Sequence, residues 1–125
     1  MSNQYFRIQV GRRTMEYLQQ RARGRGRAVP RVKVLAHLKT YYFPRLQDRM
    51  FRDIYSGLPI CMTAKGDPRG LFIPTTPEEV EAFRVELFEK VPGVIATERY
   101  RTVLAHYPHL APRQGKQANL FMEES

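Results

Sequence analysis

The hydrophobic period of the chain changes within residues 43–75. The first part repeats apolar side chains every four residues, as one face of a helix does: Leu46, Met50 and Ile54. Pro44 fits the first turn of this predicted helix, and Gly57 is expected to end it. Residues 58–63 then alternate, which is the period of a half-buried strand. Residues 64–70, AKGDPRG, predict a turn, and residues 71–73 predict a short returning strand.

Three arginines share the outer face of the predicted helix, because Arg45, Arg49 and Arg52 recur at i, i+4 and i+7. A basic helix followed by a basic-tipped hairpin is the second half of a winged helix-turn-helix. In that architecture the helix enters the DNA major groove and the hairpin touches the backbone beside it. The alternative is an ordinary helix and hairpin whose arginines are solvated.

Residues before this unit predict two further helices. Residues 6–10 alternate apolar and polar side chains, so they are either a short strand or a tail that orders on contact. From Thr14 the period becomes helical, and RGRGR at residues 23–27 is expected to end that helix. Pro30 is predicted to open a second helix that runs to about Lys39. Its expected inner face is Val32, Leu35 and Ala36, with Val34 and Leu38 flanking. Together these elements follow the winged-helix order.

Residues 76–79, TPEE, mark the start of another helix. Thr76 is the expected cap, Pro77 the first helical residue and Glu79 the reciprocal partner of a capping box. We therefore interpret these carboxylates as structural. The apolar stripe of this helix is Val80, Phe83, Leu87 and Val91. After Pro92, a last helix is predicted from about Ile95 to His106. The two helices are expected either to pack on the hairpin side or to form a dimer contact.

The predicted fold is mainly α with a small β-hairpin: a winged helix-turn-helix, two C-terminal helices and a flexible tail. We expect one domain, with a basic region over residues 1–75, a helical extension over 76–110 and the tail over 111–125. The net charge of +9 is uneven along the chain. Residues 1–75 contain 15 Lys/Arg against 4 Asp/Glu, or +11, and residues 76–125 contain 6 against 8, or −2. A basic half of this kind is typical of a nucleic-acid partner.

Other chemistry has little support in the sequence. Cys61 is the single cysteine, which excludes an internal disulfide, and it is expected to be a buried, inert thiol. His37, His106 and His109 lack the further ligands that a metal site needs. There is no phosphate-binding glycine loop, no apolar run of membrane-spanning length and no secretory signal. We expect a cytoplasmic protein that is not an enzyme and needs no cofactor.

The DNA-binding hypothesis assigns roles to nine residues. Arg45, Gln47, Arg49 and Arg52 would face the groove, since arginine can bond guanine and glutamine can bond adenine at two points. Backbone phosphates would be contacted by Lys65 and Arg69 of the hairpin and by Arg23, Arg25 and Arg27 of the RGRGR loop. That loop is equally consistent with a solvated linker, and single-strand binding through it stays open as a further mode.

Residues 117–121, QANLF, resemble the peptide motif that binds the bacterial sliding clamp. In that family a glutamine hydrogen-bonds at one end of a clamp pocket and a Leu-Phe pair fills an apolar subsite. Gln117, Leu120 and Phe121 match these roles, whereas Ala118 stands where leucine is common. The resemblance implies recruitment to the replication clamp, and a tail that folds back on the domain is the alternative.

Residues 46–107 resemble a group of small phage and prophage winged-helix proteins. The shared features are Asp48-Arg49 and Arg52 in the helix, the GLPI turn at 57–60, the hairpin and the PEEV helix start at 77–80. The resemblance implies a phage-encoded DNA-binding protein, most simply a replication accessory or initiator in a bacterial host cell. The alternatives are a transcription regulator, and an interaction module or inhibitor that acts on the host replication machinery. A homodimer stays open.

Overall fold

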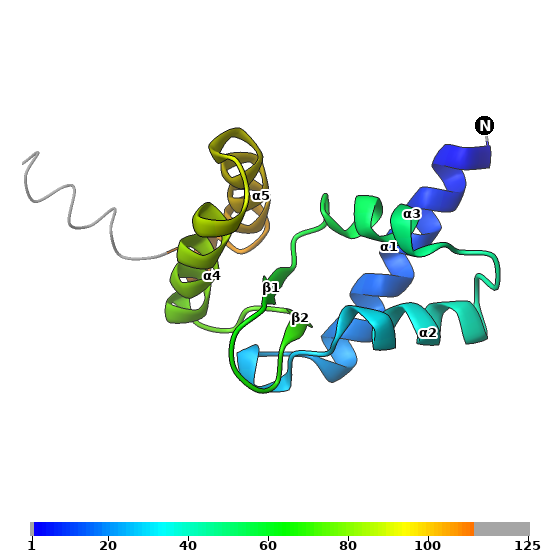
Figure 1. The fold of residues 1–125 in the computed structure, drawn as a ribbon, viewed down its shortest axis with the longest axis horizontal. Helices are drawn as coiled ribbons and strands as arrows, with labels where there is room; N and C mark the ends of the chain where they lie inside the picture. The colour runs from blue at the N-terminus through cyan, green and yellow to red at the C-terminus, as the bar shows by residue number, and fades with distance from the viewer. Residues whose placement is uncertain (1, 112–125) are drawn as a thin grey trace, which may run out of the picture.

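The computed structural model describes residues 2–111, which form a mainly helical protein with one small hairpin (Figure 1). The elements within this range are, in chain order, α1 (Ser2–Arg21), the 3-10 turn η1 (Arg25–Arg27), α2 (Arg31–Tyr41), α3 (Asp48–Tyr55), β1 (Cys61–Thr63), β2 (Gly70–Phe72), α4 (Pro77–Lys90), α5 (Gly93–His106) and the 3-10 turn η2 (Pro108–Leu110). Within this range, no helix combines the length and the apolar character that crossing a membrane requires.

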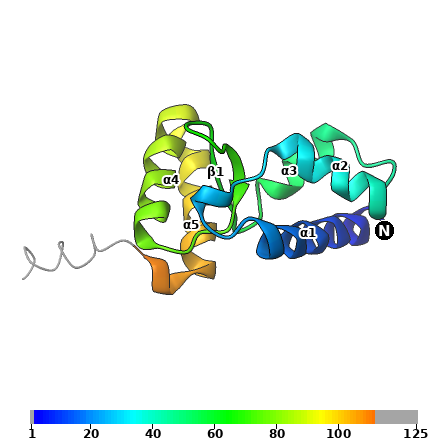
Figure 2. The same cartoon turned by 90° about the horizontal axis from the view of Figure 1, so that it is seen from below.

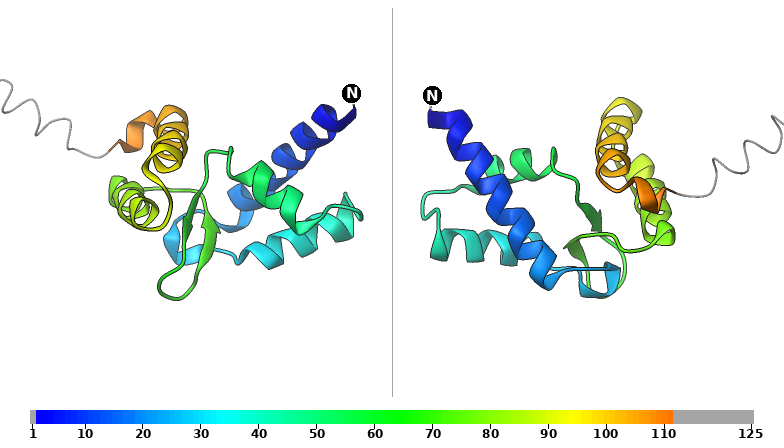
Figure 3. Two further views of the ribbon diagram at one scale, coloured as in Figure 1. Left: turned by 45° about the horizontal axis from the view of Figure 1, so that its top comes forward. Right: turned by 180° about the vertical axis from the view of Figure 1, so that it is seen from behind.

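The helices form two groups with the hairpin between them (Figures 1 and 2). In one group, α1 packs against both α2 and α3 and lies behind them, as the rear view in Figure 3 shows. In the other, α4 packs against β1 and α5 packs against α4. Of the two arrangements expected for the C-terminal helices, packing on the hairpin side is therefore the one observed. Residues 112–125 of the predicted tail lie outside the described residues.

The N-terminal segment corrects the sequence interpretation, because residues 6–10 are neither a strand nor a tail but belong to α1. The helix keeps a four-residue repeat that the local alternation hides: Phe6, Val10, Thr14 and Leu18 line one side, and the last three are fully buried. Gly11 lies inside this helix, and a Cβ atom there would stand 3.3 Å from Leu58 Cδ2. The glycine thus permits close contact between α1 and the segment after α3.

Helix α3 begins at Asp48, four residues later than predicted. Pro44 and Arg45 lie in the link, where Leu46 is 1% exposed and its N–H bonds the Phe43 carbonyl oxygen in a turn. Gln47 has the extended backbone of an N-cap residue. The burial of Leu46 in this link is thus favoured over an earlier start of the helix, since Phe51, Ile54 and Tyr55 already supply the buried side of α3.

Helix α2 buries a different face from the one expected. Val34 and Leu38 are fully buried, whereas Val32 is 61% exposed and Ala36 is exposed as well. Apolar residues occur all round this helix, so the period alone does not select the side that meets α1. Leu35 is packed against the core only in part.

The hairpin is shorter than predicted, and a third segment joins it. Only Cys61–Thr63 and Gly70–Phe72 pair as strands, with Cys61 opposite Phe72 and Thr63 opposite Gly70. Cys61 and Thr63 are the buried positions of β1, and Met62 is half-buried. Val29, between α1 and α2, adds an antiparallel bridge to Leu71 through two hydrogen bonds of 2.8 and 2.9 Å.

The start of α4 confirms Thr76 as the helix cap, but Glu79 is not the reciprocal partner that a capping box requires. The Thr76 hydroxyl accepts from the Glu79 N–H at 3.2 Å, and Pro77 is the first helical residue. The Glu79 carboxylate does not return to Thr76. It accepts from the Thr75 N–H at 2.8 Å and from the Arg25 N–H at 2.9 Å. One side chain therefore orders the helix start and anchors η1.

The core joins both groups of helices through the hairpin. Cys61 is fully buried, as expected, and burial raises the pKa of its thiol well above the ordinary range. Tyr107 at the end of α5 donates its hydroxyl to the Pro59 carbonyl at 2.8 Å, and burial raises its pKa to about 12. The predicted stripe of α4 is buried at Val80, Phe83 and Leu87.

His37 on α2 is held between two tyrosines. Its ring centroid lies 4.4 Å from that of Tyr17 and 4.9 Å from that of Tyr41. Burial lowers the pKa of His37 below 6.5, and the charge of Arg21 lowers it further. Neutral imidazole is therefore the form that the fold prefers.

Replacing Gly70 with alanine should strongly destabilise the fold. Gly70 has φ +130°, and a Cβ atom there would lie 2.1 Å from the Val29 carbonyl oxygen, a backbone atom. Relief of that clash requires the bridge between Val29 and Leu71 to open, so we expect a loss of at least about 3 kcal/mol in urea unfolding. Gly26→Ala is the matched control, since a Cβ atom at Gly26 meets nothing within 4 Å. Equal stability of the two variants would contradict this packing.

His37→Phe should flatten the pH dependence of stability on the acid side. Because the folded-state pKa of His37 is below 6.5, the unfolded chain takes up this proton first as the pH falls. The stabilisation is thus fully present above about pH 7 and is lost below about pH 6.5. The phenylalanine variant keeps the ring and loses this proton linkage, so its Tm should fall less between about pH 7.5 and pH 5.5. His109→Phe on η2 is the control, and a wild-type slope for His37→Phe would refute the assignment.

Candidate nucleic-acid interface

The nine residues of the DNA-binding hypothesis lie in three places. One is α3 with the link before it, the second is the tip of the hairpin, and the third is the loop around η1. The hairpin tip and η1 are neighbours, because the Arg25 side chain of η1 donates to the Thr63 hydroxyl and to the Lys65 carbonyl. The helix α3 and the hairpin both lie on the side facing the viewer in Figure 1, with α1 behind.

On α3 the predicted arginine row is only partly present. Arg49 is exposed on the outer face of the helix. Arg52 is exposed too, but its Nε atom lies 3.2 Å from Asp48 Oδ2 in an ion pair within the helix. Arg45 lies in the link and so does not share the helical face, which corrects the spacing argument. Gln47 is exposed at the N-cap position and makes no capping hydrogen bond with its side chain.

Acidic side chains on α3 are neutralised by arginines from elsewhere. Asp48 also pairs with Arg31 at the start of α2, and Asp53 pairs with Arg7 of α1 at 2.5 Å. Asp48 stands in the first helical turn, where the helix dipole favours a negative charge. These pairs tie α3 to its two neighbours and keep the carboxylates from presenting net negative charge beside Arg49.

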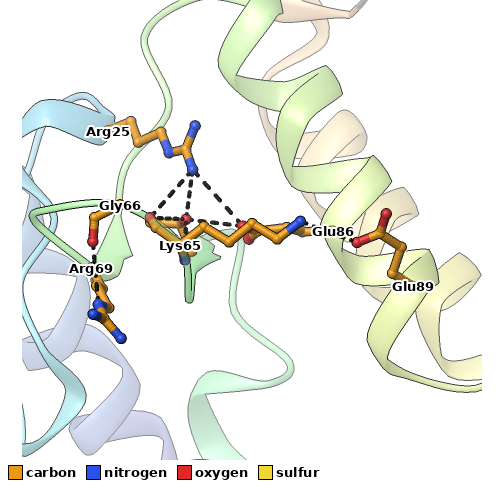
Figure 4. Close-up of polar contacts among 7 residues, drawn as sticks. Arg25, Lys65, Gly66, Arg69, Glu86 and Glu89 are labelled. Atoms are coloured by element: carbon orange, nitrogen blue, oxygen red, sulfur yellow. Dashed lines mark hydrogen bonds and ion pairs between the residues drawn. The ribbon is translucent and has the colours of Figure 1, made fainter.

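At the hairpin tip, one basic residue faces back to the protein and one faces outward. Lys65 Nζ lies 3.3 Å from Glu89 Oε1 of α4, as Figure 4 shows. Arg69 donates its Nε–H to the Gly66 carbonyl at 3.2 Å, which orients the guanidinium and leaves the side chain exposed. Arg69 and Arg31 line one open hollow between the hairpin and the start of α2.

The Arg25 side chain makes structural contacts with two other elements of the fold. Its Nη2 atom donates to Thr63 Oγ1 at 2.8 Å and lies 3.8 Å from Glu86 Oε2 (Figure 4). Thr63 Oγ1 is 3.2 Å from the same Glu86 oxygen, and both residues are buried. A buried carboxylate needs such a partner, because the charge is costly to hold away from water. Arg25 therefore compensates Glu86 and joins η1, β1 and α4.

The basic residues of the hypothesis thus separate into two sets. Arg25, Arg52 and Lys65 are held by carboxylates. None of the ion pairs found within residues 2–111 involves the other five arginines, all of which are exposed: Arg23, Arg27, Arg45, Arg49 and Arg69. We refer to these five as the open arginines.

Sequence reasoning missed two determinants of this surface. Glu86 lies at the margin of the apolar stripe of α4, one residue before Leu87, and that position was the available signal for a buried carboxylate. Arg31 had no such signal, since α2 and the link after it separate Arg31 from Asp48 along the chain. Within residues 2–111, no group of three or more His, Cys, Asp or Glu side chains is arranged to hold a metal ion.

No protein-family model matches the chain, and comparisons with curated proteins and with solved structures found no significant match.

Proposed function

We propose that this protein binds duplex DNA in the manner of a winged helix, with α3 in the major groove and the hairpin beside it. The observation that carries the proposal is the element order: helix, bridging segment, helix, helix, hairpin, with Val29 of the bridging segment joined to Leu71 of the hairpin by an isolated antiparallel bridge. A winged helix uses the same order to fix its recognition helix next to its hairpin.

The charge distribution supports the same proposal. The open arginines come from α3 and its link and from the hairpin, which are the two elements that a winged helix directs at DNA, and from the loop around η1. Arg49 is the proposed base contact. Arg23, Arg27 and Arg69 are proposed phosphate contacts, with Arg45 at the edge of the groove. The three ion-paired residues take no part in the proposed contacts.

A role in phage replication in a bacterial host is the wider form of this proposal, and it depends on the tail. The motif over residues 117–121 lies outside the described residues, so the sequence resemblance is its support. A protein that binds DNA and the sliding clamp would act as a replication accessory. A regulator of transcription would need the DNA contacts alone, and an inhibitor of the host machinery would need the clamp contact alone.

Arg49→Ala should weaken duplex binding by about tenfold or more, as expected for one lost base contact. The measurement is fluorescence anisotropy with labelled duplex DNA at low and moderate salt. Arg101→Ala, an exposed cation on α5, is the matched control and should bind as the wild type does.

The double variant Arg23→Ala/Arg27→Ala should reduce the slope of log affinity against log salt by about two. Absence of duplex binding at low salt would overturn the proposal.

Leu120→Ala/Phe121→Ala should abolish co-elution of the full chain with a purified bacterial sliding clamp. These two residues are the apolar anchors of the proposed motif, and apolar anchors carry much of the energy of such contacts. Met122→Ala, just outside the motif, is the control and should co-elute unchanged. Clamp binding that survives the double substitution would show that the pentapeptide is not the docking motif.

A further inference from the structure

A row of aromatic rings lies where α2 meets α1. Tyr17 of α1 contacts His37 of α2, and His37 contacts Tyr41, with centroid separations of 4.4 and 4.9 Å. His37 also lies 6.2 Å from Tyr42. We call these four residues, Tyr17, His37, Tyr41 and Tyr42, the aromatic seam.

The outer end of the aromatic seam is open to solvent. Tyr41 is 68% exposed and Tyr42 is 43% exposed, whereas Tyr17 is buried beneath them. The inner rings therefore hold the outer ones in place. Neither tyrosine is required to close the core at this point, since Val34 and Leu38 of α2 already fill it.

Arginines lie directly on this seam. The Arg13 guanidinium is 4.2 Å from the ring centroid of Tyr42, and that of Arg21 is 5.2 Å from the centroid of Tyr17. One acidic residue borders the seam, because Glu16 pairs with Arg13 at 3.1 Å. These three charges sum to +1, so the aromatic surface has a cationic border.

We propose that the aromatic seam binds single-stranded nucleic acid, with unpaired bases stacked on Tyr41 and Tyr42 and the backbone near Arg13 and Arg21. Exposed aromatic rings interleaved with cations are the features that bind unpaired strands without sequence preference. A duplex does not satisfy the same surface, because its base faces are covered by their neighbours. The proposal is independent of the duplex contacts of α3 and uses different residues.

A second exposed apolar surface provides a contrast within the same protein. Val85 and Phe88 of α4 are 44% and 42% exposed, similar to Tyr42. They share α4 with Glu81 and Glu89, which are ion-paired with Arg84 and Lys65. That surface offers one exposed ring, Phe88, whereas the aromatic seam offers two, Tyr41 and Tyr42, so base stacking favours the aromatic seam for an unpaired strand.

The test is binding of a labelled oligothymidylate to the full chain, followed by fluorescence anisotropy. Tyr41→Ala/Tyr42→Ala should lower affinity about ten- to hundredfold, the effect of losing one or two stacked bases. Tyr41→Phe/Tyr42→Phe keeps both rings and should restore binding. Phe88→Ala is the matched control on α4 and should bind as the wild type does. Thermal unfolding of each variant shows that it is folded.

Two further readouts separate this proposal from the duplex proposal. The alanine double variant should keep wild-type affinity for duplex DNA, and Arg49→Ala should keep wild-type affinity for oligothymidylate. Photocrosslinking with an iodouracil-containing strand should place the adduct on Tyr41 or Tyr42. The proposal is overturned if the alanine variant binds oligothymidylate normally, if the phenylalanine variant fails to restore binding, or if adducts form only on α3, the hairpin or the loop around η1.

Discussion

The bridge between Val29 and Leu71 is the contact on which the arrangement of the other elements depends. Its two backbone hydrogen bonds join the segment between α1 and α2 to the hairpin. The approach is so close that Gly70 is needed there, since any Cβ atom would overlap the Val29 carbonyl. The same pairing brings η1 alongside the hairpin tip and sets the start of α2 next to Arg69. Without it, the two groups of helices would share far less common core.

The cations of the basic half of the chain have two different environments: some form ion pairs between elements, and others are exposed without an ion pair inside residues 2–111. Helix α4 contributes three carboxylates toward the other half, and Glu79, Glu86 and Glu89 hold the Arg25 backbone, the Arg25 side chain and Lys65. Asp48 and Asp53 hold further arginines around α3. Several cations therefore stabilise contacts between elements, whereas the five open arginines take part in no ion pair found within the described residues. A high net charge alone does not identify a binding surface, because the partners of each cation have to be known.

The sequence predicted most of the helices and the hairpin, and it did best where a local rule applies. The cap at Thr76 and the stripe of α4 follow from spacing, and the mainly helical composition with a small hairpin is confirmed. It did worse where two periods compete. Residues 6–10 alternate over too short a stretch to exclude a helix, and α2 is apolar on several sides, so its buried face could not be chosen. Of the candidate site, the positions of the exposed arginines were predictable, but their ion pairs were not.

What the sequence determined by itself is therefore local and compositional. Glycine and proline positions, a cap and a four-residue repeat limit the backbone over a few turns, and the charge difference between the halves follows from counting. The tertiary structure alone decided which cations are neutralised, where α3 begins, and that Tyr41 and Tyr42 stand over Tyr17 and His37 as one row. The physical reason is that ion pairs and ring contacts between elements depend on distances across the fold. No periodicity along the chain encodes those distances.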